Sequence, residues 1–183
     1  MLRRCGAGKV VGIRLAEDLH DLDALVIPGG ESTVISKLLV EQNMMKRVKA
    51  LAKEGLPMFG TCAGCIMLAT DIQQRPEQPR IGALNVTVDR NAYGSQIDSF
   101  ETKVKSEYKA FVHGPPLHVV HIRAPAIVDV GQGVEVLAKH NDRPILVRQG
   151  GMLACTFHPE LTNDSRVHQL FLEMVQERKQ ALA

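Results

Sequence analysis

The segment Gly60-Thr61-Cys62-Ala63-Gly64 places the strongest constraint on how this chain can fold. It follows the apolar run Pro57-Met58-Phe59 and precedes the apolar stretch from Cys65 to Ala69, which predict a buried strand and the start of a helix. Glycines on both sides of a central residue permit a sharp strand-to-helix turn that exposes a nucleophile at the carboxyl edge of a sheet. The helix dipole at such a turn favours a reactive thiolate. We therefore interpret Cys62 as a nucleophile; the alternative is a tight turn with a buried cysteine.

Short β-rich runs alternate with helical stretches along the chain, which is typical of an α/β domain with a largely parallel sheet. Residues 23–27 predict a buried strand, and residues 32–54 carry helix-type spacing that breaks near Asn43. A final amphipathic helix is predicted over residues 164–180, with Asp164 as its N-cap. Further strands are expected at residues 84–88, 99–104, 117–122, 134–138, 144–147 and 152–157.

Composition limits the classes of protein to which the chain can belong. Its 183 residues, 45% of them hydrophobic, suffice for one substantial core, so we expect a single domain. The net charge of +2 is spread along the chain and only 4% of residues are aromatic, which argues against nucleic acid as a partner. No apolar run approaches the roughly 20 residues of a membrane helix, and no apolar leader opens the chain, so we expect no membrane partner and a cytoplasmic location. In that compartment the four cysteines are reduced.

The segment Phe157-His158-Pro159-Glu160 offers a base and a group to orient it, the two partners that a thiolate nucleophile requires. In extended backbone, residues i and i+2 point to the same face of a strand. Glu160 can then fix the tautomer of His158 while the other ring nitrogen faces Cys62. The alternative is a surface histidine and glutamate beside a turn proline.

A third motif, Pro28-Gly29-Gly30-Glu31-Ser32, follows the predicted strand at residues 23–27. We interpret it as part of an oxyanion hole, in which the backbone amides of Gly30 and Ala63 bind a tetrahedral oxyanion. The alternative is an ordinary strand-to-helix turn capped by Ser32. All three motifs come at the carboxyl ends of predicted strands, where open α/β sheets place their sites.

In this order, P-G-G-E-S-T, G-T-C-A-G and F-H-P-E resemble the motifs of the triad-type glutamine amidotransferases, and within them the PdxT/SNO family. The segment from Arg90 to Phe100 is the more specific match, together with Ile122-Arg123-Ala124-Pro125 and His158 to Thr162. The resemblance covers nearly the whole chain from about Cys5 onward. It implies a three-layer α/β fold of the class I glutamine amidotransferase type, with helices on both sides of a largely parallel central sheet.

The resemblance also implies a reaction, the hydrolysis of L-glutamine to glutamate and ammonia, with Cys62, His158 and Glu160 as the catalytic residues. No metal or organic cofactor is implied. The ammonia passes in this family to a separate synthase subunit, of the PdxS/SNZ type, in a hetero-oligomeric pyridoxal 5'-phosphate synthase. The implied glutamine-binding residues are Gly30, Glu31, Ser32, Arg90, Ile122 and Arg123.

The resemblance raises one expectation about the amino end. Members of the family begin with a strand of the type I-G-V-L-A-L-Q-G and a helix, and the segment from Leu2 to Ala7 resembles the end of that helix. We therefore expect residues 1–183 to form a single glutamine amidotransferase domain without the family's first strand and with only the end of its first helix. Loss of that strand would expose apolar neighbours and lower stability.

Three other interpretations remain open at the level of sequence. Cys62-x-x-Cys65 and Cys155-x-x-His158 match the ligand set of a Cys3His zinc site, although residues 155 and 158 would point to opposite faces of a strand. A glutaminase of another pathway, such as histidine biosynthesis, or a PfpI-like cysteine hydrolase would share the nucleophile turn. A binding subunit would keep the motifs without the activity.

Overall fold

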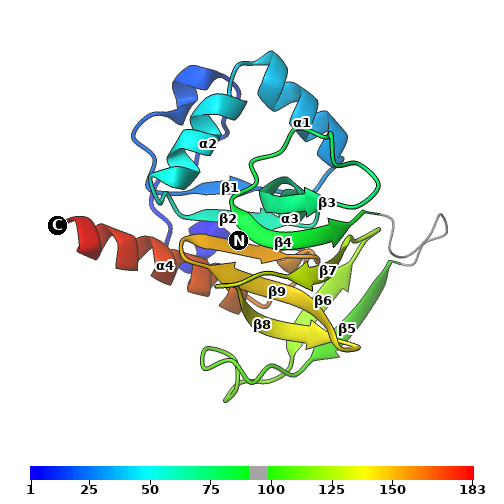
Figure 1. Cartoon of the computed structure of the whole chain (residues 1–183). Helices are drawn as coiled ribbons and strands as arrows, with labels where there is room; N and C mark the ends of the chain where they lie inside the picture. Colours follow the sequence, from blue (N-terminus) through cyan, green and yellow to red (C-terminus); the bar gives the residue numbers. More distant parts are fainter. Residues whose placement is uncertain (91–98) are drawn as a thin grey trace.

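A five-stranded sheet with helices on both sides forms the centre of the computed structural model (Figure 1). The structure describes residues 1–90 and 99–183. Residues 91–98, which belong to the segment that carried the more specific family resemblance, lie outside the described residues.

Helices and strands alternate over the first part of the chain, as the sequence predicts, whereas the described residues from 69 to 155 form strands and loops without an α-helix. The helices are α1 (Ser32–Glu41), α2 (Met45–Lys53), α3 (Ala63–Leu68) and α4 (Arg166–Leu182), and the 3-10 turns are η1 (Leu2–Cys5), η2 (Ala16–Leu19) and η3 (Pro159–Leu161). The strands are β1 (Leu25–Ile27), β2 (Met58–Thr61), β3 (Ala69–Ile72), β4 (Leu84–Asp89), β5 (Phe100–Val104), β6 (Leu117–His121), β7 (Ala126–Val130), β8 (Glu135–His140), β9 (Arg143–Gln149) and β10 (Met152–Cys155).

The central sheet has the strand order β1-β2-β10-β9-β8. Strands β1, β2 and β10 are parallel, whereas β9 is antiparallel to both β10 and β8. Two smaller sheets accompany it, one of order β3-β4-β7 and one of β5 paired with β6. The carboxyl ends of β1, β2 and β10 therefore share one edge, and each of the three predicted motifs begins there.

Two hydrophobic clusters form the core, and alternate residues of β2 contribute to different clusters. Met58 belongs to the cluster that packs against α2 and α3, and Phe59 to the cluster that packs against α4. Figure 1 shows α1 and α2 over one side of the central sheet and α4 along the other. The predicted fold class, an α/β fold with a central sheet between helices, is thus confirmed.

Most predicted elements are present, with several corrections. The helical stretch breaks at Asn43 as expected, where φ is 56°. Strands β3 and β7 were not predicted, and Ala69 begins β3 rather than continuing a helix. Ser165, not Asp164, is the N-cap of α4, although the carboxylate of Asp164 accepts a hydrogen bond from the amide of Arg166 at 3.2 Å.

Within the described ranges, no helix combines the length and the apolar character that crossing a membrane requires.

Phe171 connects α4 to the sheet and should be a main contributor to stability. Its side chain is 1% exposed and its ring centroid lies 5.4 Å from that of Phe59. We expect Phe171→Ala to lower the free energy of unfolding by about 3–5 kcal/mol, because it removes a large buried side chain and leaves a cavity. Leu182→Ala is the matched control on the same helix, since Leu182 is 70% exposed. Equal urea midpoints for the two variants would contradict this description of the core.

Candidate active site

Cys62 lies between the end of β2 and the first turn of α3. Its backbone has φ 50° and ψ −105°, a conformation that non-glycine residues rarely adopt. The surrounding backbone holds it there, because its amide donates to the carbonyl of Cys155 at 2.9 Å and its carbonyl accepts from the amide of Cys65 at 3.0 Å. The predicted nucleophile turn is therefore present, with strain at the residue proposed to react.

The glycines of the motif are required by close backbone approach. A Cβ atom on Gly64 would collide with the carbonyl of Ile27 at the end of β1, and one on Gly60 would collide with the carbonyl of Gly64. Neither obstacle is a flexible side chain, so neither can give way cheaply. Glycine at these two positions lets α3 start directly against β1 and β2.

His158 and Glu160 form a hydrogen-bonded pair, with 2.7 Å between His158 Nδ1 and Glu160 Oε1. The sequence predicted this pairing on the assumption that residues 158–160 are extended, and that assumption is wrong. Glu160 lies in the turn η3, and His158 is the residue before it, with φ −110° and ψ 83°. The amide of His158 donates to the carbonyl of Val120 at 2.8 Å, which ties the histidine to the end of β6.

The pair is electrostatically matched. Hydrogen bonds to Cys62 and then to Glu160 raise the pKa of His158 to about 10, although burial opposes this. Burial raises the pKa of Glu160, but the hydrogen bonds from His158 and the backbone lower it more, so its net shift is downward. His158 is therefore protonated and Glu160 ionised near neutral pH.

The glycine-rich loop and the end of β6 meet the two reactive groups. Gly29 packs directly against the imidazole of His158, since a Cβ on Gly29 would overlap the ring at Cε1. The thiol of Cys62 donates to the carbonyl of Ile122 at 3.9 Å. Gly30 has φ 148°, in the region that favours glycine. The hydroxyl of Ser32 is buried and has no hydrogen-bond partner among the described residues, so it is available to a ligand.

Two of the three charged residues expected to bind glutamine are in contact with each other. Arg90 Nη2 donates to Glu31 Oε1 at 2.8 Å, and Arg90 Nη1 donates to the side-chain oxygen of Gln78 at 2.9 Å. Arg123 lies after β6, exposed, with φ 45°. The structure thus places Glu31 and Arg90 together although 59 positions separate them.

The cysteines of the alternative zinc site are not gathered around a common centre. Cys65 packs in the cluster beside α2 and α3, whereas Cys155 packs in the cluster beside α4 and donates to the carbonyl of Phe157 at 3.3 Å. Burial raises the pKa of the Cys65 thiol to about 12 and that of Cys155 well above its usual range. Over residues 1–90 and 99–183, no three His, Cys, Asp or Glu side chains are placed to hold a metal ion.

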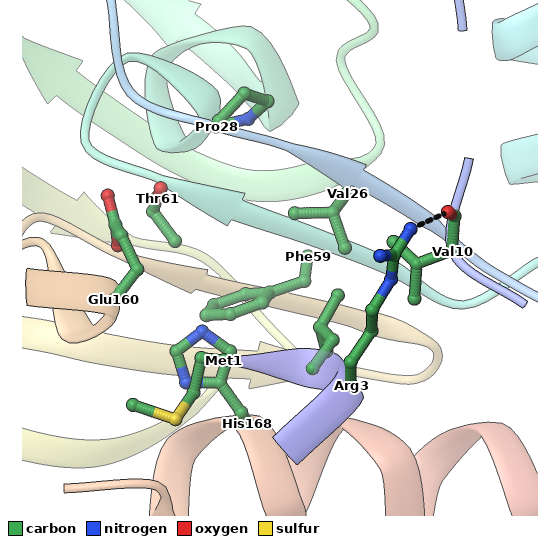
Figure 2. A pocket seen from close by; sticks show the side chains of 10 residues that line it. Met1, Arg3, Val10, Val26, Pro28, Phe59, Thr61, Glu160 and His168 are labelled. Carbon is green, nitrogen blue, oxygen red and sulfur yellow. Dashed lines mark hydrogen bonds between the residues drawn. The ribbon is translucent and has the colours of Figure 1, made fainter. Parts of the chain in front are cut away.

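A cavity of about 340 Å³ is lined by Glu160, by His168 of α4 and by residues of β1, β2 and the amino end (Figure 2). Its lining is mainly apolar. Two buried polar atoms of lining residues, Thr61 Oγ1 and His168 Nδ1, have no hydrogen-bond partner within the described part of the chain. Neither Cys62 nor His158 lines this cavity, so it is distinct from the space in front of the reactive groups.

Two residues near the reactive groups were not identified from the sequence. Gly29 belonged to a recognised motif, but its contact with His158 depends on tertiary structure. His121 at the end of β6 is fully buried, with 3.2 Å between its Nε2 and the hydroxyl of Thr156, which lies two residues before His158. Its position before Ile122 was the one available signal.

Comparison with known proteins agrees with this geometry. The model of the SNO glutamine amidotransferase family matches residues 1–177. This chain belongs to that family. Within the SNO family it is 52% identical over 175 residues to the "Pyridoxal 5'-phosphate synthase subunit PdxT" of Parafrankia sp. (strain EAN1pec), covering 95% of this chain and 84% of the relative.

A second relative and a solved structure also resemble this chain over most of its length. The PdxT subunit of Thermus thermophilus is 50% identical over 163 residues, which cover 88% of this chain and 83% of that protein. A structure described as "Crystal structure of glutamine amidotransferase" is 47% identical and matches with a TM-score of 0.87, covering 96% of this chain and 90% of that chain.

Stability should depend on pH through His121. Burial, followed by the nearby His140 and His158, lowers its pKa to about 4, below the 6.5 of an unperturbed histidine. At pH 5 the His121 side chain binds a proton in the unfolded chain but not in the folded one. The contribution of His121 to the free energy of unfolding is therefore complete above pH 6.5 and is lost as the pH falls toward 4. We expect His121→Phe to remove about 2 kcal/mol of the decrease in unfolding free energy between pH 7.5 and pH 5.

Urea unfolding of both proteins at the two pH values measures this difference directly. Groups that titrate independently of residue 121 cancel in the comparison. A decrease in unfolding free energy that is equal in the parent and in His121→Phe would contradict the assignment.

Proposed function

We propose that this chain is the glutaminase subunit of a pyridoxal 5'-phosphate synthase and hydrolyses L-glutamine to L-glutamate and ammonia. One observation carries the proposal. Cys62 lies in a strained turn close enough to His158 to raise the pKa of that histidine, and His158 is itself hydrogen-bonded to the carboxylate of Glu160. A nucleophile, a base and an orienting group in this arrangement are what acyl transfer through a covalent intermediate requires.

The proposed reaction begins when the Cys62 thiol, having passed its proton to His158, attacks the side-chain amide carbon of glutamine as a thiolate. His158, protonated near neutral pH, donates a proton to the departing ammonia, and a glutamyl thioester remains. His158, now neutral, removes a proton from water, which hydrolyses the thioester and releases glutamate. Glu160 stabilises the imidazolium and fixes the ring throughout. The reaction needs no metal or organic cofactor.

The proposal assigns the remaining residues of the site to substrate binding. The amides of Gly30 and Ala63 stabilise the oxyanion, since Ala63 follows the nucleophile at the first turn of α3 and Gly30 lies in the loop beside His158. The unpartnered hydroxyl of Ser32 offers a hydrogen bond to the substrate. Arg90 and Glu31 recognise the α-carboxylate and α-ammonium groups of glutamine. Ile122 and Arg123 complete the proposed site.

The partner belongs to the proposal as well. The relatives at about half identity are named as PdxT subunits of pyridoxal 5'-phosphate synthase. We infer that this chain forms a single glutamine amidotransferase domain that passes ammonia to a synthase subunit of the PdxS/SNZ type, in the cytoplasm. Glutamate release measured with and without that subunit distinguishes this role from a glutaminase of another pathway.

Removal of the nucleophile tests the reaction. Cys62→Ala should lower glutamate release by at least about 10³-fold while the protein remains folded, because the change deletes a reactive atom rather than a core side chain. Cys65→Ala and Cys155→Ala are the matched controls and should lose stability rather than chemistry. His158→Asn should be nearly as inactive as Cys62→Ala, and Glu160→Gln less impaired. Activity of Cys62→Ala within about tenfold of the parent would end the proposal.

Gly29 offers a test of geometry. Gly29→Ala should displace the imidazole of His158, because the added methyl group would occupy the place of the ring. We expect kcat to fall by about 10²-fold, the effect of a misplacement near 1 Å, with little loss of thermal stability. Gly8→Ala is the control, since a Cβ there meets no atom within 4 Å. Equal kcat values for the two variants would show that the Gly29 contact does not matter.

A further inference from the structure

Gln78 is a buried polar residue that follows the exposed residues 73–77. It lies between β3 and β4 with 6% of its surface exposed, whereas Gln73, Gln74 and Glu77 of the same loop are exposed. The backbone around it is held from two directions. Its amide donates to the carbonyl of Arg75 at 3.1 Å, and its carbonyl accepts from Arg80 Nη1 at 3.1 Å.

The side-chain amide of Gln78 is oriented at both ends. Its nitrogen lies 4.0 Å from the sulfur of Met67, a fully buried residue of α3, and its oxygen accepts from Arg90 Nη1 at 2.9 Å. Burial leaves an amide few alternative partners, and a buried acceptor left without a donor is costly. Gln78 therefore presents its oxygen to Arg90 in a fixed direction.

Arg90 is in turn held between two acceptors. Its Nη1 group bonds to Gln78 and its Nη2 group to Glu31, and its side chain is 17% exposed. Glu31 also accepts from the hydroxyl of Thr33 at 3.1 Å. A chain of contacts thus runs from α3, which begins beside Cys62, through Gln78 and Arg90 to the loop that contains Gly30.

We propose that Gln78 is a positioning residue for glutamine binding, which fixes the guanidinium of Arg90 and, through it, the carboxylate of Glu31. The inference rests on the proposed function, because it assigns the role of Gln78 within that site. A guanidinium is a planar fork whose hydrogen bonds are strongly directional. Because Gln78 holds its Nη1 group, the guanidinium of Arg90 keeps a single orientation toward the bound amino acid. Its side chain then loses less conformational freedom when the amino acid binds.

Glutamine binding in a Cys62→Ala background tests the inference without turnover. We expect Gln78→Met, which keeps the length of the side chain but removes the acceptor, to raise the Kd for L-glutamine about tenfold in calorimetry. In the enzyme with Cys62 intact, the same change should raise KM about tenfold and leave kcat within about twofold. Gln73→Met is the matched control, an exposed glutamine of the same loop, and should change neither constant.

The outcomes separate the inference from the proposed function. An unchanged Kd in Gln78→Met, or a decrease in kcat at constant KM, would overturn the role of Gln78. A lower melting temperature with an unchanged Kd would assign it a structural role only. If Gln78→Met does not fold, Gln78→Asn, which withdraws the acceptor by one methylene group, should still raise the Kd, and an unchanged value would overturn the inference. A parent that binds glutamine without hydrolysing it would end the proposed function and leave this inference standing.

Discussion

The contact between the first turn of α3 and the end of β1 determines the arrangement of the site. Gly64 lies so close to the carbonyl of Ile27 that no side chain fits between them. This approach brings the turn at Cys62 beside the loop that follows β1. The same loop places Gly29 against the Cε1 edge of the His158 ring, so the absence of a side chain at Gly29 sets the distance between the loop and the histidine. Two glycines thus define the space in which the reactive groups meet.

Cys62 and His158 come from separate elements, and a backbone hydrogen bond ties each of them to a neighbouring strand. The amide of Cys62 donates to the carbonyl of Cys155, the last residue of β10, and the amide of His158 donates to the carbonyl of Val120 in β6. Strand β6 belongs to a different sheet, so the second bond connects the central sheet to the β5 and β6 pair. The position of the base therefore depends on how the small sheet packs, as well as on the central one.

Local patterns in the sequence predicted the helices, most strands and the three motifs, because each depends on residues close together in the chain. Strand β3 was missed because Ala69 to Ile72 directly continues the apolar helix α3 without a glycine or proline to mark the change. The pairing of His158 with Glu160 was predicted, but the 3-10 turn that creates it was not, since Pro159 is compatible with either geometry. Gln78 could not be found from the sequence, because its neighbours indicate an ordinary exposed loop and its partner Arg90 is 12 residues away.

Charge balance explains how such a site can receive a zwitterion. Arg90 and Glu31 neutralise each other at 2.8 Å, so neither is an unpaired charge in a partly buried position. Glutamine carries one carboxylate and one ammonium group beside its side-chain amide, and under the proposed function it adds a second pair of opposite charges to the first. Binding of glutamine then leaves the net charge of the site unchanged. Arg90 faces the α-carboxylate of the ligand and Glu31 faces its α-ammonium group. Arg90 must keep its orientation when glutamine binds. The hydrogen bond from its guanidinium to Gln78 can persist in the complex, and it therefore holds the guanidinium in place.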